Sequence, residues 1–189
     1  MGKKYIMRIG WFVLKLKCKF VDLAFSPPKS LAIFKKITKH YFLKNGITIG
    51  ENCCIYSDIT TPEGYLIFIG NNVTISNDVQ FVTHDNSIDR ILNDKSDIFG
   101  EIHIGNNCFI GARSLILPGV TLADRVIVGS GSIVTKSFME SSIIIAGNPA
   151  RKIGDWEGYI KKYGHMGFDS SGNIRQKIAD HPERVLRNR

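Results

Sequence analysis

The sequence lacks long hydrophobic runs and is poor in cysteine. No apolar stretch approaches the roughly 18 residues that a membrane-spanning helix needs, so we expect no transmembrane segment. The short apolar stretch at residues 9–14 is not followed by a small-residue cleavage site, and a signal peptide is therefore not expected. The four cysteines lack the spacing of metal ligands, and no phosphate-binding loop or Ser-His-Asp set is apparent. We expect a cytoplasmic protein with reduced thiols and no metal requirement.

Acidic residues are nearly absent from the first part of the chain. Residues 1–46 contain eleven Lys or Arg and one acidic residue, Asp22, which gives a net charge of +10. The remaining residues contain fourteen basic and sixteen acidic residues, a net charge of −2, so the overall +8 belongs to the N-terminal segment. Because these basic residues are not interleaved with a recognisable nucleic-acid-binding motif, we expect no nucleic-acid role.

A six-residue repeat over residues 104–139 is the dominant pattern. Its first position is aliphatic in every block, its fifth is mostly small or β-branched, and positions two to four are rich in Gly, Asn, Asp and Pro. Positions one and five can point inward from a short strand while the others turn a corner, because Asn, Asp and Gly tolerate the left-handed backbone that corners need. A helix would need apolar residues at three- and four-residue spacing. The repeat therefore predicts a parallel β-helix in which each coil buries its neighbour.

The repeat begins at Ile49 and is interrupted twice before it reaches this regular stretch. The first interruption, residues 60–68, is a turn that contains Pro, Glu and Gly. The second, loop 85–101, is a mostly polar run that follows directly after His84. Loops of this length inside a compact domain are usually functional or disordered. Since His84 stands where a coil gives way to this loop, its ring can face a cleft rather than the packed interior.

The basic segment, residues 1–46, is interpreted as two helices. In residues 1–25, apolar residues recur at three- and four-residue spacing, and this set comprises Ile6, Ile9, Val13, Leu16, Phe20 and Leu23. A second helix is predicted over residues 30–42, with Ser30 as its N-cap and Gly46 as its stop. Two compatible interpretations are open. The helices cover the open end of the β-helix, or residues 1–25 bind an anionic membrane surface, where each Lys or Arg contributes about 1 kcal/mol.

The chain thus divides into three predicted segments. A basic amphipathic helical segment spans residues 1–46, and an all-β main domain spans 47–153, including loop 85–101. A C-terminal helix and tail span 154–189, in which residues 156–163 are expected to form a short helix packed on the last coil.

Four stretches of the β-helix segment are similar to the hexapeptide-repeat acyltransferases, in particular the branch of maltose, galactoside and xenobiotic O-acetyltransferases. They are residues 79–84, 116–121, 130–136 and 147–151. The resemblance covers about residues 47–153. It implies a left-handed β-helix, a homotrimer with active sites between subunits, and acetyl-CoA as the acyl donor.

The resemblance also implies roles for individual residues. His84 matches the family's catalytic histidine, and with an unperturbed pKa near 6.5 a histidine can act as a neutral base at pH 7. A backbone N–H near Ala112 is implied as the group that stabilises the oxyanion. The positions that match the family's donor-binding residues are Gly111, Ala112, Ser130, Gly131, Thr135, Lys136 and Arg151. Of these, Lys136 and Arg151 are suited to the phosphates of the coenzyme.

One residue of the family pattern is missing. The sugar O-acetyltransferases pair the histidine with an Asn one coil earlier, where this chain has Tyr56, with Asp58 two residues on. Either residue is a candidate for contact with the acceptor, and Asp85 is a candidate to orient His84. The expected function is O-acetylation of a sugar, in bacterial surface-polysaccharide assembly. The alternatives are acetylation of a xenobiotic or antibiotic, and a trimeric scaffold without activity.

Overall fold

The computed structural model describes residues 10–19, 27–92, 94–169 and 171–186 of the chain. The chain folds into two compact units, Met1–Ile153 and Gly154–Arg189. The second unit begins where the C-terminal segment was predicted to begin. The basic N-terminal segment belongs to the same unit as the β-helix, and what was predicted for residues 1–9 and 20–26 lies outside the described residues.

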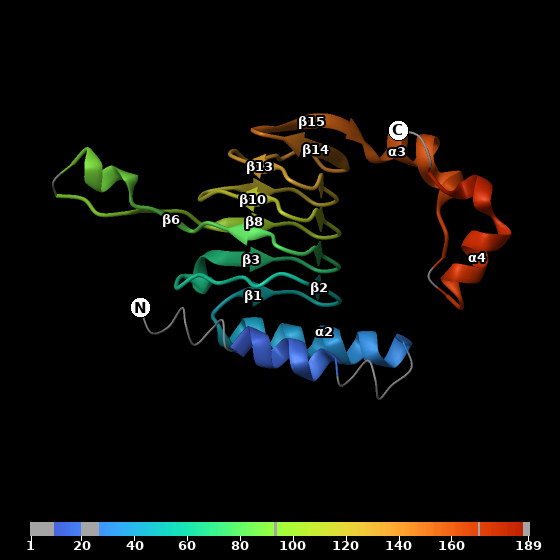
Figure 1. Ribbon diagram of the computed structural model, residues 1–189. Helices are drawn as coiled ribbons and strands as arrows, with labels where there is room; N and C mark the ends of the chain where they lie inside the picture. Colours follow the sequence, from blue (N-terminus) through green and yellow to red (C-terminus); the bar gives the residue numbers. More distant parts are fainter. Residues whose placement is uncertain (1–9, 20–26, 93, 170, 187–189) are drawn as a thin grey trace. The chain divides into compact units, whose positions relative to one another are not determined.

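Short strands, most of them paired in parallel, build three sheets (Figure 1). Sheet A contains β1 (Thr48–Ile49), β3 (Ile67–Ile69), β8 (Ile102–Ile104) and β11 (Thr121–Leu122). Sheet B contains β2 (Cys54–Ile55), β4 (Thr74–Ile75), β9 (Phe109–Ile110), β12 (Ile127–Val128), β14 (Ile143–Gly147) and β15 (Ala150–Asp155). Sheet C contains β5 (Gln80–Phe81), β10 (Leu115–Ile116) and β13 (Ile133–Val134). The chain visits the sheets in turn, so each coil stacks on the one before it.

The buried residues are those that the repeat predicts. In sheet B, Ile75 pairs with Ile110 and Ile110 pairs with Val128, and all three side chains are fully buried. The fifth positions, such as Cys108 and Val126, are buried beside them. Each first-position side chain therefore lies on the same position of the next coil, which forms one continuous apolar core. The prediction that positions one and five point inward is confirmed.

The corners also follow the repeat. Residues at the fourth position adopt positive φ angles, for example 56° at Asn107 and 60° at Arg113. At one corner the third positions form a ladder, in which Asn71 N donates to Asn106 Oδ1 at 2.9 Å and Asn106 N donates to Asp124 Oδ1 at 2.7 Å. These side chains satisfy backbone N–H groups that the turn leaves outside the sheets.

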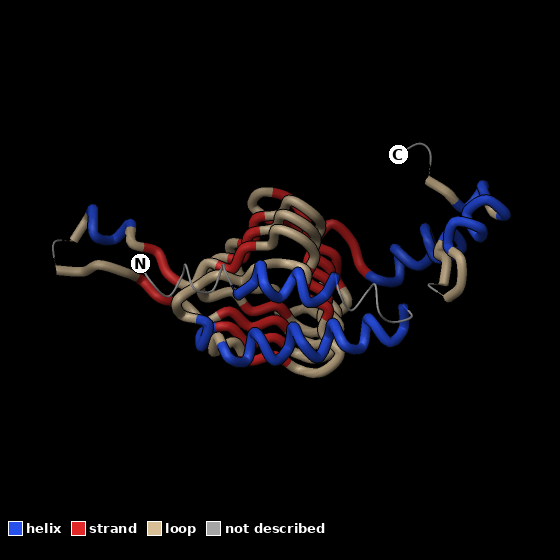
Figure 2. The backbone as a smooth tube through the Cα atoms, turned by 60° about the horizontal axis from the view of Figure 1, so that its bottom comes forward, coloured by secondary structure: helices blue, strands red, loops and turns tan. Residues whose placement is uncertain are grey.

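Two helices lie across the end of the first coil (Figure 2). Residues 10–19 are helical, and α2 (Pro27–Lys44) begins earlier than the predicted residue 30, because proline is well tolerated in the first helical turn. Gly46, at φ 87°, follows the end of α2 as predicted. Phe42 of α2 is fully buried, and its ring centroid lies 5.5 Å from that of Trp11. The described helices therefore cover the end of the hydrophobic core.

The face of the first helix that packs on this core differs from the periodic apolar set. Trp11 and Leu14 are buried, whereas Val13 and Leu16 are 44% and 47% exposed. The large Trp11 ring packs against the rings of both Tyr41 and Phe42, so the face that carries Trp11 is the buried one. The periodic set therefore does not mark the buried face, since Val13 and Leu16 of that set lie outward.

The long loop after β5 is structured. β6 (His84–Asp85) and β7 (Ile98–Phe99) pair antiparallel and form a ribbon that projects from the β-helix, with a 3₁₀ turn, η2 (Ser87–Arg90), beyond β6 (Figure 1). The shorter interruption contains another 3₁₀ turn, η1 (Gly64–Leu66). The predicted loop 85–101 therefore contains short regular elements.

The second unit is helical. It contains α3 (Trp156–Tyr163), η3 (Gly164–Met166), α4 (Ile174–Asp180) and η4 (Pro182–Arg184). The predicted helix over 156–163 is confirmed, and Asp155 caps it by accepting a 2.8 Å hydrogen bond from Gly158 N. Its packing on the last coil stays a prediction. Within the described ranges, no helix has both the length and the apolar character needed to span a membrane.

Candidate functional site

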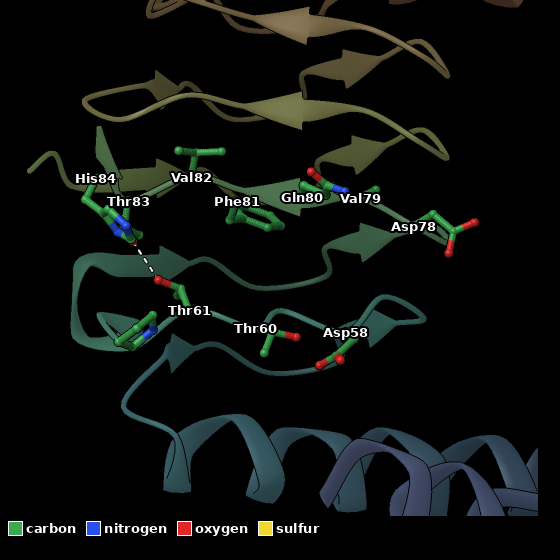
Figure 3. A pocket seen from close by; sticks show the side chains of 11 residues that line it. Asp58, Thr60, Thr61, Asp78, Val79, Gln80, Phe81, Val82, Thr83 and His84 are labelled. Atoms are coloured by element: carbon green, nitrogen blue, oxygen red, sulfur yellow. Dashed lines mark hydrogen bonds between the residues drawn. The ribbon is translucent and has the colours of Figure 1, made fainter. Parts of the chain in front are cut away.

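A cavity of about 540 Å³ lies on the sheet C side of the first two coils. Its lining comes from Asp58 and residues 60–62 in the first coil and from residues 78–84 in the second (Figure 3). Polar groups from both coils face it, including Asp58, Thr60 and Gln80. His84 lies at one end of this lining and Asp78 at the other (Figure 3). The predicted base thus borders a cavity, as its place at the end of a coil suggested.

His84 is held by a carboxylate from the previous coil. Its Nδ1 lies 3.0 Å from Glu63 Oε2, and the two side chains are 38% and 14% exposed. The His84 ring also packs at a tilt against Phe99 of β7, with ring centroids 5.9 Å apart. The His84 ring is therefore held on two sides. Glu63 of the first interruption contacts one side, and Phe99 of the ribbon contacts the other.

Glu63 is in turn held by two buried hydroxyl groups. Thr61 Oγ1 and Thr83 Oγ1 each lie 2.9 Å from Glu63 Oε2, and the two hydroxyls are 2.6 Å apart. Desolvation on its own would raise the pKa of the Glu63 carboxyl, but the hydrogen bonds from Thr83, Thr61 and His84 outweigh it and lower that pKa below its usual value. Glu63 is consequently a carboxylate at neutral pH.

The structure separates the three predicted acceptor-site residues. Asp58 lines the cavity, whereas Tyr56 lies in a different hollow with Trp11 and stacks on Phe34 at a centroid distance of 5.2 Å. Asp85 is exposed, and its Oδ1 accepts a 2.8 Å hydrogen bond from Ser87 N. Asp85 does not contact the His84 ring, because neighbouring residues of a strand point to opposite sides. The carboxylate that contacts the ring is that of Glu63.

Four of the predicted donor-binding residues meet at the corner between sheets B and C. Gly131 N donates to Ala112 O at 2.8 Å, and an added Cβ at Gly111 would lie only 2.5 Å from Ser130 N. The last three residues of that set, Thr135, Lys136 and Arg151, are exposed elsewhere, after β13 and in β15. The donor site as a whole stays a prediction.

Sequence reasoning missed Glu63, Thr61 and Thr83 as members of the site. For Thr61 and Glu63 the available signal was the first interruption, because residues inserted into a regular repeat are not bound to its core pattern. Among the described residues, no group of three or more His, Cys, Asp or Glu side chains is arranged to hold a metal ion.

Comparison with known proteins places this fold in a family. A family model described as the hexapeptide repeat of succinyl-transferase matches residues 101–136. Protein CapG of Staphylococcus aureus is 45% identical over 133 residues, which is 68% of this chain and 77% of that protein. The chain belongs to the hexapeptide-repeat acyltransferase family.

Two further comparisons agree with this assignment. Galactoside O-acetyltransferase of Escherichia coli K12 is 33% identical over 120 residues, or 63% of this chain and 59% of that enzyme. The solved hexapeptide-repeat acetyltransferase of Vibrio cholerae is similar with a TM-score of 0.52 and 20% identity, covering 82% of this chain and 94% of that one. The predicted fold class, a left-handed parallel β-helix, is confirmed.

Proposed function

We propose that this protein is an acetyl-CoA-dependent O-acetyltransferase that modifies a sugar hydroxyl, in the assembly of a bacterial surface polysaccharide. The observation that carries this proposal is His84, which borders a polar cavity with its Nδ1 engaged by a carboxylate. The name of the galactoside O-acetyltransferase supports both the acetyl donor and a sugar acceptor.

The geometry suits direct transfer with His84 as general base. With Nδ1 donating to Glu63, Nε2 carries the lone pair that removes the proton from the acceptor hydroxyl. The hydroxyl oxygen forms a bond to the thioester carbonyl carbon, and the C–S bond breaks. The imidazolium then returns its proton to the leaving thiolate. The polar lining of the cavity, which includes Asp58, Thr60 and Gln80, offers hydrogen-bonding groups for a polyhydroxyl acceptor.

An acceptor panel tests this proposal. Thiol release from acetyl-CoA is measured with free sugars, activated sugars, oligosaccharides and hydroxyl-bearing antibiotics. We expect turnover with a carbohydrate acceptor. Turnover with an antibiotic alone would favour the xenobiotic alternative, and the absence of turnover together with the absence of acetyl-CoA binding would favour the inactive scaffold.

We also propose that the protein is a homotrimer. The ribbon that leaves the β-helix at His84 carries exposed apolar side chains, with Ile91 79%, Ile98 50% and Phe99 55% exposed, and these suit burial against a second copy. Sedimentation equilibrium should give about three times the 21.2 kDa chain mass. A stable monomer at micromolar concentration would contradict this assembly.

A third proposal is peripheral attachment to an anionic membrane on the cytoplasmic side. The outward face of the helix over residues 10–19 exposes Phe12 (63%), Val13 and Leu16, and exposed lysines flank them on the same helix. Apolar side chains beside basic ones bind anionic lipid through burial and Coulomb attraction, and salt screens the attraction.

Vesicle flotation with point variants tests this attachment better than truncation, because Trp11 and Leu14 of the same helix are part of the core. The intact protein should float with anionic vesicles at low salt and dissociate at high salt. Phe12→Glu with Leu16→Glu should abolish flotation without changing the melting temperature. Ile160→Glu, at an equally exposed position in α3, is the matched control and should float normally. Absence of binding by the intact protein would contradict the proposal.

A further inference from the structure

We propose that Glu63 is the positioning residue for His84, which it holds with Nδ1 protonated and Nε2 available as the base. This inference rests on the proposed function in so far as His84 is the base. The arrangement of Glu63 is a separate observation, because its contacts with His84, Thr61 and Thr83 do not depend on the proposed reaction.

The backbone of the turn at residues 60–68 is held by contacts with the end of α2 and the start of β1. Gly64, directly after Glu63, is buried against the junction of α2 and β1, where an added Cβ would lie 2.2 Å from Asn45 O and 3.2 Å from Ile47 Cγ1. Only glycine fits this position without displacing backbone. The turn thus packs against the backbone at the end of α2, and this contact fixes the position of the Glu63 backbone.

The side chain is fixed at its far end by the two threonines. The Thr61 and Thr83 hydroxyls supply two protons, while three contacts join them to each other and to Glu63 Oε2. Both threonines are buried, with exposures of 4% and 1%. A carboxylate oxygen can accept from both hydroxyls and from a ring N–H, since it offers lone pairs only. Hydrogen bonds from these hydroxyls and from His84 lower the pKa of Glu63, so the cluster holds an ionised carboxylate at neutral pH.

The consequence for His84 follows from hydrogen-bond polarity. An ionised carboxylate only accepts, so the Nδ1 that lies 3.0 Å from it must donate. In the neutral ring the proton is then on Nδ1, and Nε2 is the basic atom. When Nε2 takes the acceptor proton, the resulting imidazolium lies beside a negative charge that was present beforehand, which lowers the cost of forming it.

A second Glu–His pair in the chain shows what this arrangement adds. Glu101 Oε2 lies 2.8 Å from His103 Nε2, but these side chains are 57% and 43% exposed, whereas the Glu63 side chain is only 14% exposed. The His103 ring instead stacks on Phe68, with centroids 4.5 Å apart. The carboxylate–imidazole distances of the two pairs are similar, but Glu63 contacts Nδ1 of His84 whereas Glu101 contacts Nε2 of His103. Glu101 is therefore a matched control for Glu63.

The test combines a kinetic and a structural readout on Glu63→Ala and Glu101→Ala in the full-length protein. Long-range ¹H–¹⁵N spectra of ¹⁵N-histidine-labelled protein report the tautomer of each ring, and the His84 signals are assigned from their loss in His84→Ala. We expect wild-type His84 to be the Nδ1–H tautomer. In Glu63→Ala it should move toward Nε2–H, with kcat lowered by roughly 100-fold and KM for acetyl-CoA nearly unchanged. Glu101→Ala should keep the wild-type kcat and the His84 tautomer.

A folded Glu63→Ala protein with unchanged kcat and an unchanged His84 tautomer would overturn the inference. If that variant does not fold, Glu63→Gln keeps the volume and removes the charge, and we expect kcat at least roughly 10-fold below wild type. Wild-type kcat in a folded Glu63→Gln protein would also overturn it. Failure of the proposed function would give a different result. The wild type would then acetylate no acceptor, but Glu63→Ala would still change the tautomer of His84.

Discussion

The coils from β8 to β13 and the coils from β1 to β5 are built from the same six-residue repeat, but they differ in what lies between the strands. The later coils are uninterrupted, and their first and fifth positions pack in register. The earlier coils contain the turn at residues 60–68 and are followed by the ribbon that begins at His84. The cavity, His84 and the carboxylate on its ring all belong to the earlier coils.

This difference shows how a repeat fold acquires a site. In the regular coils almost every inward position is committed to the stacked core, and the outward positions are corners. The residues of an insertion are not needed to fill the core, so their side chains can gather around a site. Glu63 lies in the turn that interrupts the first coil, and His84 lies at the start of the ribbon that follows the second coil. These two coils are neighbours, so the two side chains can come into contact.

The largest effect on stability is expected in the regular coils. Leu122 in β11 is 1% exposed, and Leu122→Ala should lower the free energy of unfolding by about 2–5 kcal/mol through lost burial and a residual cavity. Chemical denaturation measures this, with Leu43→Ala, 47% exposed on α2, as a control that should change little. The activity of the remaining folded fraction should stay near wild type, and a specific loss of kcat would contradict the division between the two regions.

A smaller loss of stability with a larger loss of activity is expected at the first interruption. Gly64→Ala forces the turn away from Asn45 O, at a cost of about 1–3 kcal/mol by overpacking. Because the turn carries Glu63, kcat should fall together with stability. Gly154→Ala is the control, since an added Cβ there meets no atom within 4 Å. Wild-type kcat in Gly64→Ala would show that the position of this turn does not matter for the chemistry.

The smallest expected effect is the pH dependence that Glu63 adds to folding. Its pKa is lowered in the folded state, so its contribution to stability is present above the unfolded pKa and is lost as pH falls through the folded one. The free energy of unfolding of the wild type should exceed that of Glu63→Gln by about 1 kcal/mol at pH 7, the scale of one net hydrogen bond. The difference should shrink below about pH 4.3, the ordinary glutamate value. A difference that grows toward low pH would contradict the lowered pKa.

The regular region could be predicted from the sequence because a local period determines it. The inward position of residues such as Ile110 and Val128 follows from the repeat alone, and so do the left-handed corners at Asn107 and Arg113. His84 was predicted from its match to the family's catalytic histidine and from its place where a coil gives way to the long loop.

The contacts of the site could not be predicted in this way. Glu63 reaches His84 across a coil boundary, and the shape of the inserted turn decides that contact, whereas Asp85 was adjacent in sequence and points elsewhere. The same holds for the first helix. Its periodic set included Val13 and Leu16, but the fit of one large ring, Trp11, on α2 decided which face is buried.

The central claim, that the general base belongs to the interrupted coils, is tested most directly by comparing His84→Ala with His103→Ala. His103 lies in the regular strand β8 and also pairs with a glutamate. With acetyl-CoA and the best acceptor, His84→Ala should lower kcat by roughly 100-fold or more, whereas His103→Ala should retain wild-type turnover and both should melt as wild type does. Equal turnover in a folded His84→Ala protein would contradict the account.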